Sequence, residues 1–115
     1  MKKNPQLYVM HIVEAITHIE EYAGNDYDIF CKDKKTYDAV LHNLQTMAES
    51  TKRLPEEMKQ RHPEINWRDI AGFLNILVHD YLEGINEARI WKVITKYLPP
   101  LKQAMMNENI VTPKD

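Results

Sequence analysis

One segment of the chain combines an almost fully apolar helical pattern with a single narrow polar stripe. Between residues 65 and 83, Arg68, Gly72, Asn75, His79 and Glu83 recur at helical spacing and fall within about 80° of one another. Histidine changes protonation near neutral pH, so a histidine on this polar stripe could accept or donate a proton in acid–base chemistry.

The polar stripe has two interpretations, and helical periodicity does not choose between them. In the first, it is a solvent-facing edge, and His79 is an exposed or hydrogen-bonded histidine. In the second, it lines a cleft across a two-fold dimer axis, where paired copies of Asn75 and His79 meet. Glycine inside a helix costs about 1 kcal/mol relative to alanine, so Gly72 suggests a close approach at this face.

Helical periodicity elsewhere predicts the elements that must position this segment. Apolar residues recur at three- and four-residue spacing over 8–22, 37–54 and 87–98. We expect Asn66 to cap the helix of the polar stripe, which should run from Trp67 to about residue 82. No strand pattern is evident in the sequence. The predicted fold class is therefore all-α, an antiparallel four-helix bundle with extra short helical segments.

Turn and cap residues set the expected limits of the first two helices. Gly24 should end the first, because glycine tolerates the left-handed turn that closes a helix. Asp33 is the expected N-cap of the second. Residues 27–32 should form a short connection whose Ile29 and Phe30 enter the core.

The end of the chain is expected to be less regular. Pro99 and Pro100 should break or kink the last main helix, leaving 101–106 as a final helical segment. We predict one domain over residues 1–106 and a polar, frayed tail over 107–115.

Composition limits the function classes. The 115 residues are 43% hydrophobic and 28% charged, with a formal charge of −2, so one soluble domain is expected. The charge balance argues against general DNA binding. No apolar run is long enough for a membrane span, and the first residues lack the apolar core of a secretory signal. The single cysteine, Cys31, can form no internal disulfide, so we predict a cytoplasmic location.

Two further groups of residues were weighed for binding roles. The cations Lys32, Lys34, Lys35, Lys52 and Arg53 could contact phosphates, although a charge run is usually a solvated face.

The second group lies on one side of the first helix. His11, Glu14 and His18 have a spacing that permits metal ligands, but a metal site needs a completed and oriented shell. We expect a solvated or dimer-facing edge there, and neither a metal nor a cofactor.

The segment over 65–81, INWRDIAGFLNILVHDY, resembles the signature of the HepT-like proteins of the HEPN superfamily. The similarity extends through most of the chain. Its other parts are Glu20-Glu21-Tyr22, Phe30 with Asp33, Ala39-Val40 with Asn43-Leu44, Glu49 ahead of Lys52-Arg53-Leu54-Pro55, Trp91, and Leu98-Pro99.

The resemblance implies an all-helical homodimer that cleaves RNA without a metal at the dimer interface. Such proteins are toxins of type VII toxin–antitoxin pairs, and their partner is the minimal nucleotidyltransferase MntA. The family motif is an arginine, four to six residues, then His-x-Tyr. His79 matches the catalytic histidine, Asn75 matches the polar residue after the arginine, and Tyr81 matches the tyrosine that the partner modifies with AMP.

The motif arginine should stand at position 74, where this sequence has Leu74. Metal-free cleavage needs a cation or hydrogen-bond donor facing the crowded phosphate. Arg68 is a poor substitute within one chain, because eleven residues of helix separate it from His79 by about 16 Å. The alternative function is therefore a non-catalytic HEPN scaffold that serves as partner or substrate of a nucleotidyltransferase.

Overall fold

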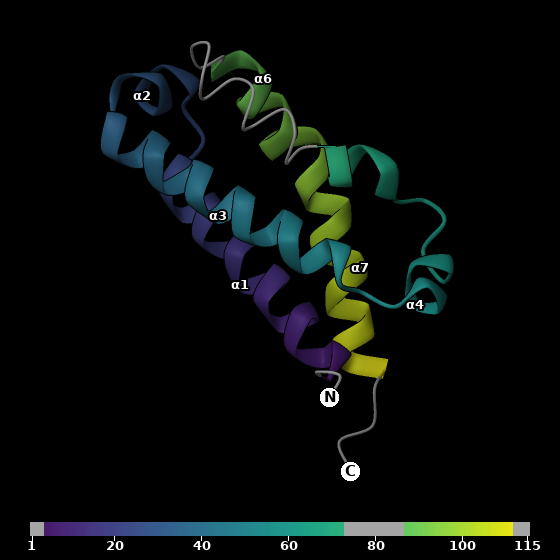
Figure 1. Cartoon of the computed structure of the whole chain (residues 1–115). Coiled ribbons are helices and arrows are strands. Elements are labelled where there is room, and N and C mark those ends of the chain that lie inside the picture. Colours follow the sequence, from purple (N-terminus) through teal and green to yellow (C-terminus); the bar gives the residue numbers. More distant parts are fainter. Residues whose placement is uncertain (1–3, 73–86, 112–115) are drawn as a thin grey trace.

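The computed structural model describes residues 4–72 and 87–111, which are mostly helical and contain no strand. The predicted all-α fold class is confirmed. In chain order the helices, shown in Figure 1, are α1 (Pro5–Ala23), α2 (Tyr27–Lys32), α3 (Lys34–Lys52), α4 (Glu56–Gln60), the helical residues 67–72, α6 (Glu87–Lys92), the π-helix η1 (Val93–Tyr97) and α7 (Leu98–Val111).

Helix α1 has a distinct signal at each end. The side chain of Asn4 accepts a hydrogen bond from the backbone N–H of Gln6 at 2.9 Å, and Pro5 occupies the first helical position. Gly24 has a φ of 64° and donates its backbone N–H to the carbonyl of Glu20 at 3.1 Å. The predicted end at Gly24 is thus confirmed, and the helix starts earlier than its apolar pattern.

The expected connection between the first two helices is itself a helical turn, α2. The side chain of Asp26 caps α2, and that of Asp33 caps α3, as predicted. Phe30 is fully buried, but Ile29 is 65% exposed, so the expectation that both enter the core is wrong. Adjacent residues on a helix point about 100° apart, and in the single turn of α2 the inward direction belongs to Phe30.

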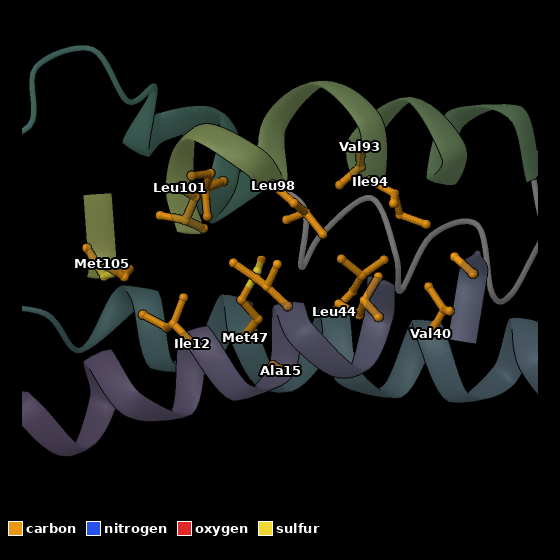
Figure 2. Close-up of a cluster of buried hydrophobic side chains, with 14 of the residues drawn as sticks. Ile12, Ala15, Val40, Leu44, Met47, Val93, Ile94, Leu98, Leu101 and Met105 are labelled. Atoms are coloured by element: carbon orange, nitrogen blue, oxygen red, sulfur yellow. The ribbon is translucent and has the colours of Figure 1, made fainter. Parts of the chain in front are cut away.

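The core lies between α1, α3 and the helical run over 87–111. Helices α1 and α3 lie side by side and run in opposite directions, and the described ends of the chain lie at the same end of the molecule (Figure 1). Figure 2 shows apolar side chains from these helices meeting in one layer: Ile12, Ala15, Val40, Leu44, Met47, Val93, Ile94, Leu98, Leu101 and Met105. Burial of these side chains is the main stabilising contribution to the fold.

The last helical run passes two prolines without ending. A π turn precedes them, in which Leu98 donates its N–H to the carbonyl of Val93, five residues earlier. Proline lacks an N–H, and its ring crowds the carbonyl four residues before it, so the wider π turn relieves this conflict. Of the two expected effects, a break or a kink, the break does not occur at Pro99 and Pro100, and the irregularity of this run lies in the π turn before them.

The helix also continues where we expected a frayed tail. Helix α7 extends through Val111, and Glu108 is only 5% exposed. Among the described residues, no helix has the length and apolar character that crossing a membrane requires.

Candidate functional site

The residues predicted to carry the chemistry fall in a part of the chain that the structure does not describe. Leu74, Asn75, His79 and Tyr81 all lie within 73–86, outside the described residues. Their roles therefore stay predictions. The structure does describe how the segment that carries them begins, over the helical residues 67–72.

The start of this helix is capped as predicted. The side chain of Asn66 accepts a hydrogen bond from the backbone N–H of Asp69 at 3.0 Å, and its carbonyl accepts from Ile70 at 3.2 Å. Because the cap satisfies an amide that has no partner within the helix, it fixes where the helix begins.

Trp67 ties this first turn to the preceding helix. Its half-buried indole N–H donates to the carbonyls of Lys59 at 3.0 Å and His62 at 3.1 Å. The two acceptors belong to the end of α4 and to the connection that follows it. Trp67, the first residue of the helix, therefore anchors the helix to the segment that precedes it.

An ion pair joins the same connection to α7. Arg61 donates from Nε to Oε2 of Glu108 at 3.0 Å and from Nη2 to Oε1 at 2.7 Å. The Arg61 side chain is 53% exposed, whereas that of Glu108 is 6% exposed. A two-pronged guanidinium–carboxylate contact fixes the relative orientation of the groups as well as their distance.

His62 completes this arrangement. Its Nε2 lies 2.7 Å from Oε2 of Glu108, and its Nδ1 lies 3.4 Å from Oε2 of Glu64. A carboxylate can only accept, so Nε2 carries the hydrogen of that bond. Both ring nitrogens thus face carboxylates, which leaves His62 without a nitrogen directed at a substrate. We refer to Arg61, His62 and Glu108 as the Glu108 clamp.

The clamp holds Glu108 as a carboxylate despite its burial. The hydrogen bonds from Arg61 lower the pKa of Glu108, and burial acts in the opposite direction. The bond from His62 lowers this pKa further. The same contact raises the pKa of Arg61. Net stabilisation of the ionised carboxylate means that the clamp is an electrostatic contact at neutral pH.

Sequence reasoning missed this clamp. Its carboxylate, Glu108, lies 46 residues after His62, in the part expected to be frayed. A signal was present, because Glu108 follows Leu101 and Met105 at the spacing of the buried face of α7.

The described part of the polar stripe contains Arg68 and Gly72. Arg68 is exposed, and Gly72 is half-buried. A Cβ atom built on Gly72 would meet no heavy atom within 4 Å. Within the described part of the chain, no residue therefore makes the expected close approach at Gly72.

The basic residues weighed for phosphate contacts form two separate groups. Lys34 and Lys52 occupy opposite ends of α3, about 27 Å apart by the helical rise. Lys34 also pairs with Asp38 at 3.1 Å. Lys32 and Lys35 lie near the first end and Arg53 near the second, so the fold does not bring these cations together.

The possible metal-ligand group on α1 lies on an exposed face of the chain. His11, Glu14 and His18 are all exposed, and the ring of His18 lies 6.1 Å from that of Tyr22. Within 4–72 and 87–111, no group of three or more histidine, cysteine or carboxylate side chains could hold a metal ion.

A family comparison covers most of the chain. Residues 12–107 match the family described as "Ribonuclease HepT-like". The chain belongs to the HepT-like ribonuclease family.

Relatives of this HepT-like chain carry corresponding names. A Thermococcus cleftensis protein named "Probable ribonuclease HepT" is 37% identical over 103 residues, which are 89% of this chain and 93% of the relative. A Caldanaerobacter subterraneus subsp. tengcongensis protein with a provisional RNase name is 33% identical over 102 residues, 88% of this chain and 90% of its own length. No solved structure matches the HepT-like chain.

Proposed function

We propose that this HepT-like chain is a metal-independent ribonuclease toxin that acts as a homodimer. The observation that carries the proposal is the family match over 12–107 together with His79-Asp80-Tyr81, which has the His-x-Tyr spacing of the family motif. Asn75 precedes His79 by four residues, the spacing that puts two side chains on one face of a helix.

In the proposed reaction, RNA supplies its own nucleophile. His79 of one protomer accepts the proton of a ribose 2′-hydroxyl, and that oxygen attacks the adjacent phosphorus. The bond from phosphorus to the 5′-oxygen breaks, and this oxygen takes a proton from the partner subunit's His79. The products are a 2′,3′-cyclic phosphate and a 5′-hydroxyl. Neither a metal nor a cofactor enters this sequence.

Leu74 weakens the proposed reaction. At this position the family motif supplies an arginine, which would stabilise the negative charge that develops on the phosphate. Loss of one such preorganised group typically lowers the rate by about 100-fold to about 1,000-fold. Leu74 is also the observation that favours the second candidate, a non-catalytic HEPN scaffold that binds or is modified by a nucleotidyltransferase.

The toxin proposal includes a partner and a modification. The partner is an MntA-like nucleotidyltransferase antitoxin, which transfers AMP from ATP to Tyr81. The phenol oxygen attacks the α-phosphorus, pyrophosphate leaves, and the phenolic proton passes to solvent. AMP adds bulk and negative charge two residues from His79, so RNA would be excluded by occupancy and by repulsion.

RNA cleavage by four forms of the chain tests the catalytic part: the present sequence, Leu74→Arg, His79→Ala and the double variant. With EDTA present throughout, we expect Leu74→Arg to cleave faster than the present sequence by about 100-fold or more. We expect no cleavage by either form that lacks His79. Cleavage that survives His79→Ala would contradict the assignment of His79. Absence of cleavage in all four forms would support the scaffold instead.

A further inference from the structure

We infer that the Glu108 clamp positions the helix that begins at Trp67, and that Glu108 is a positioning residue for the chemistry carried further along that segment. The catalytic half of this inference rests on the proposed function. The structural half rests only on described residues: Arg61, His62, Trp67 and Glu108.

The connection between α4 and this helix is held from two sides. On one side, Glu108 of α7 binds the side chains of Arg61 and His62. On the other, the indole of Trp67 binds the carbonyl of His62 at 3.1 Å. His62 is thus the shared member, because its ring contacts α7 and its carbonyl contacts the first residue of the helix.

The hydrogen bonds of the clamp are better suited to fixing the orientation of the 61–66 connection than to adding stability. Among the described residues, Glu108 accepts three hydrogen bonds through both oxygens from the side chains of Arg61 and His62, with distances of 2.7–3.0 Å. Apolar contacts tolerate sliding and rotation, whereas charge-assisted hydrogen bonds have fixed directions. A buried ion pair gains little net stability after desolvation, so a role in fixing one arrangement accounts better for its presence than stability does.

Small changes at the start of a helix become large further along it. His79 lies twelve residues beyond Trp67 in the sequence. A tilt of about 3° at the first turn of a helix displaces a side chain about 18 Å along its axis by about 1 Å. Displacements of this size can lower a catalytic rate by about 100-fold.

His62 itself is not proposed as a catalytic base. Its two ring nitrogens face Glu108 and Glu64, and its side chain is 11% exposed. Arg61 is oriented toward the same carboxylate rather than toward the described start of the polar stripe. The clamp therefore acts on the reaction through the helix that it holds.

The chain contains a second ion pair between helices, which serves as a matched control for the loss of a carboxylate. Lys102 of α7 binds Glu20 of α1 at 2.8 Å, a similar distance to the clamp bonds, but at an exposed position that does not involve the 61–66 connection. Glu108→Gln removes the clamp charge at nearly constant shape, and Glu20→Gln removes the control charge. Arg61→Lys keeps a cation but loses the two-pronged contact.

Hydrogen–deuterium exchange tests the structural half in the full-length chain. In Glu108→Gln we expect amides over 62–72 to exchange about tenfold faster or more, with α1 and α3 unchanged. Arg61→Lys should give a smaller change in the same amides, and Glu20→Gln should give none there. Unchanged exchange over 62–72, or equal acceleration throughout the chain, would overturn the inference.

RNA cleavage tests the catalytic half. The variants are made in the present sequence if it is active, and otherwise in Leu74→Arg. We expect Glu108→Gln to lower kcat by about tenfold to about 100-fold with KM little changed, because the site is misaligned rather than its RNA contacts removed. Glu20→Gln should leave both constants unchanged. Faster exchange over 62–72 with an unchanged kcat would overturn the positioning role. If no form cleaves RNA, the proposed function fails, and exchange alone still decides whether the clamp holds the helix start.

Discussion

Arg61 and Glu108 are 47 residues apart in the sequence, and they meet through two hydrogen bonds of 3.0 and 2.7 Å. The contact joins the connection after α4 to the last helix. It makes the end of α7 a structural part of the region that leads into the predicted site. The nearly buried carboxylate has consequences for stability that can be measured directly.

The clamp should make folding stability depend on acid pH. Since the pKa of Glu108 is lowered in the folded chain, its contribution is present above the ordinary glutamate value of 4.5 and is lost as pH falls through the lowered folded value. We expect Glu108→Gln to reduce the free energy of unfolding by about 1–3 kcal/mol at neutral pH. Urea unfolding of both forms should show this difference constant down to about pH 5 and shrinking below it. A difference that stays constant down to about pH 3 would contradict the role of the ionised carboxylate.

Two neighbouring residues of α2 should respond very differently to truncation. Phe30 is fully buried, with its ring centroid 5.4 Å from that of Tyr37 and 5.3 Å from that of Trp91. We expect Phe30→Ala to lower the free energy of unfolding by about 3–5 kcal/mol. Ile29 is 65% exposed, so Ile29→Ala should change it by less than about 0.5 kcal/mol. Denaturant titration of the two variants compares them, and similar losses would show that α2 packs differently.

Substitution of Asn66 should preserve stability only where the new side chain can also cap the helix. Asn66→Ala removes the acceptor for the N–H of Asp69, and we expect a loss of about 1 kcal/mol in unfolding free energy. Asn66→Asp keeps the acceptor and adds a charge that suits a helix N-terminus, so stability should be preserved or slightly raised. Thermal unfolding can rank the three forms. If Asn66→Asp lost as much unfolding free energy as Asn66→Ala, capping would not be the cause of the loss.

Modification of the chain by a nucleotidyltransferase should depend on one tyrosine. We expect incubation with an MntA-like enzyme and ATP to add one or more AMP masses to the chain, with Tyr81 in the labelled peptide. Tyr81→Phe removes the phenol oxygen that attacks the α-phosphorus and should abolish the added mass. Tyr22→Phe is a matched control, because Tyr22 is 46% exposed and lies on α1. Label at another residue, or an unchanged mass in both forms, would contradict the proposed regulation.

Features set by neighbouring residues could be predicted from the sequence. Gly24 ends α1, Asp33 caps α3 and Asn66 caps the helix at Trp67 because each interacts within four residues of itself. The all-helical fold follows from periodicity in the same way, since each amphipathic pattern is complete within one helix.

Features that depend on distant residues could not be predicted in this way. Phe30 and Ile29 have similar hydrophobicity, and only the packing of Trp91 and Tyr37 against Phe30 decides which of them is buried. The polar neighbours of Glu108 predict a frayed tail, whereas its partner Arg61 lies 47 residues away, in another part of the fold.

The predicted site depends on a different kind of information. His79 and Tyr81 stand out through a family motif, and neither charge nor periodicity alone distinguishes His79 from a surface histidine. The departure at Leu74 is likewise visible only against that motif.

The π turn over 93–97 has a consequence for how the clamp could have arisen. A π turn holds one residue more than an α turn, so it rotates all later side chains by about 100° relative to an uninterrupted α-helix. The direction in which Glu108 points is therefore set ten residues or more before it. Deletion of a single residue at Thr95 would remove this extra residue, turn the π turn into an α turn, and leave the carboxylate directed at Arg61. An α turn with all residues kept would instead carry the carboxylate about 100° around the helix axis, away from Arg61. Insertion of one residue, taken up by this turn, is thus a route by which the helix could lengthen while Glu108 kept its direction toward Arg61.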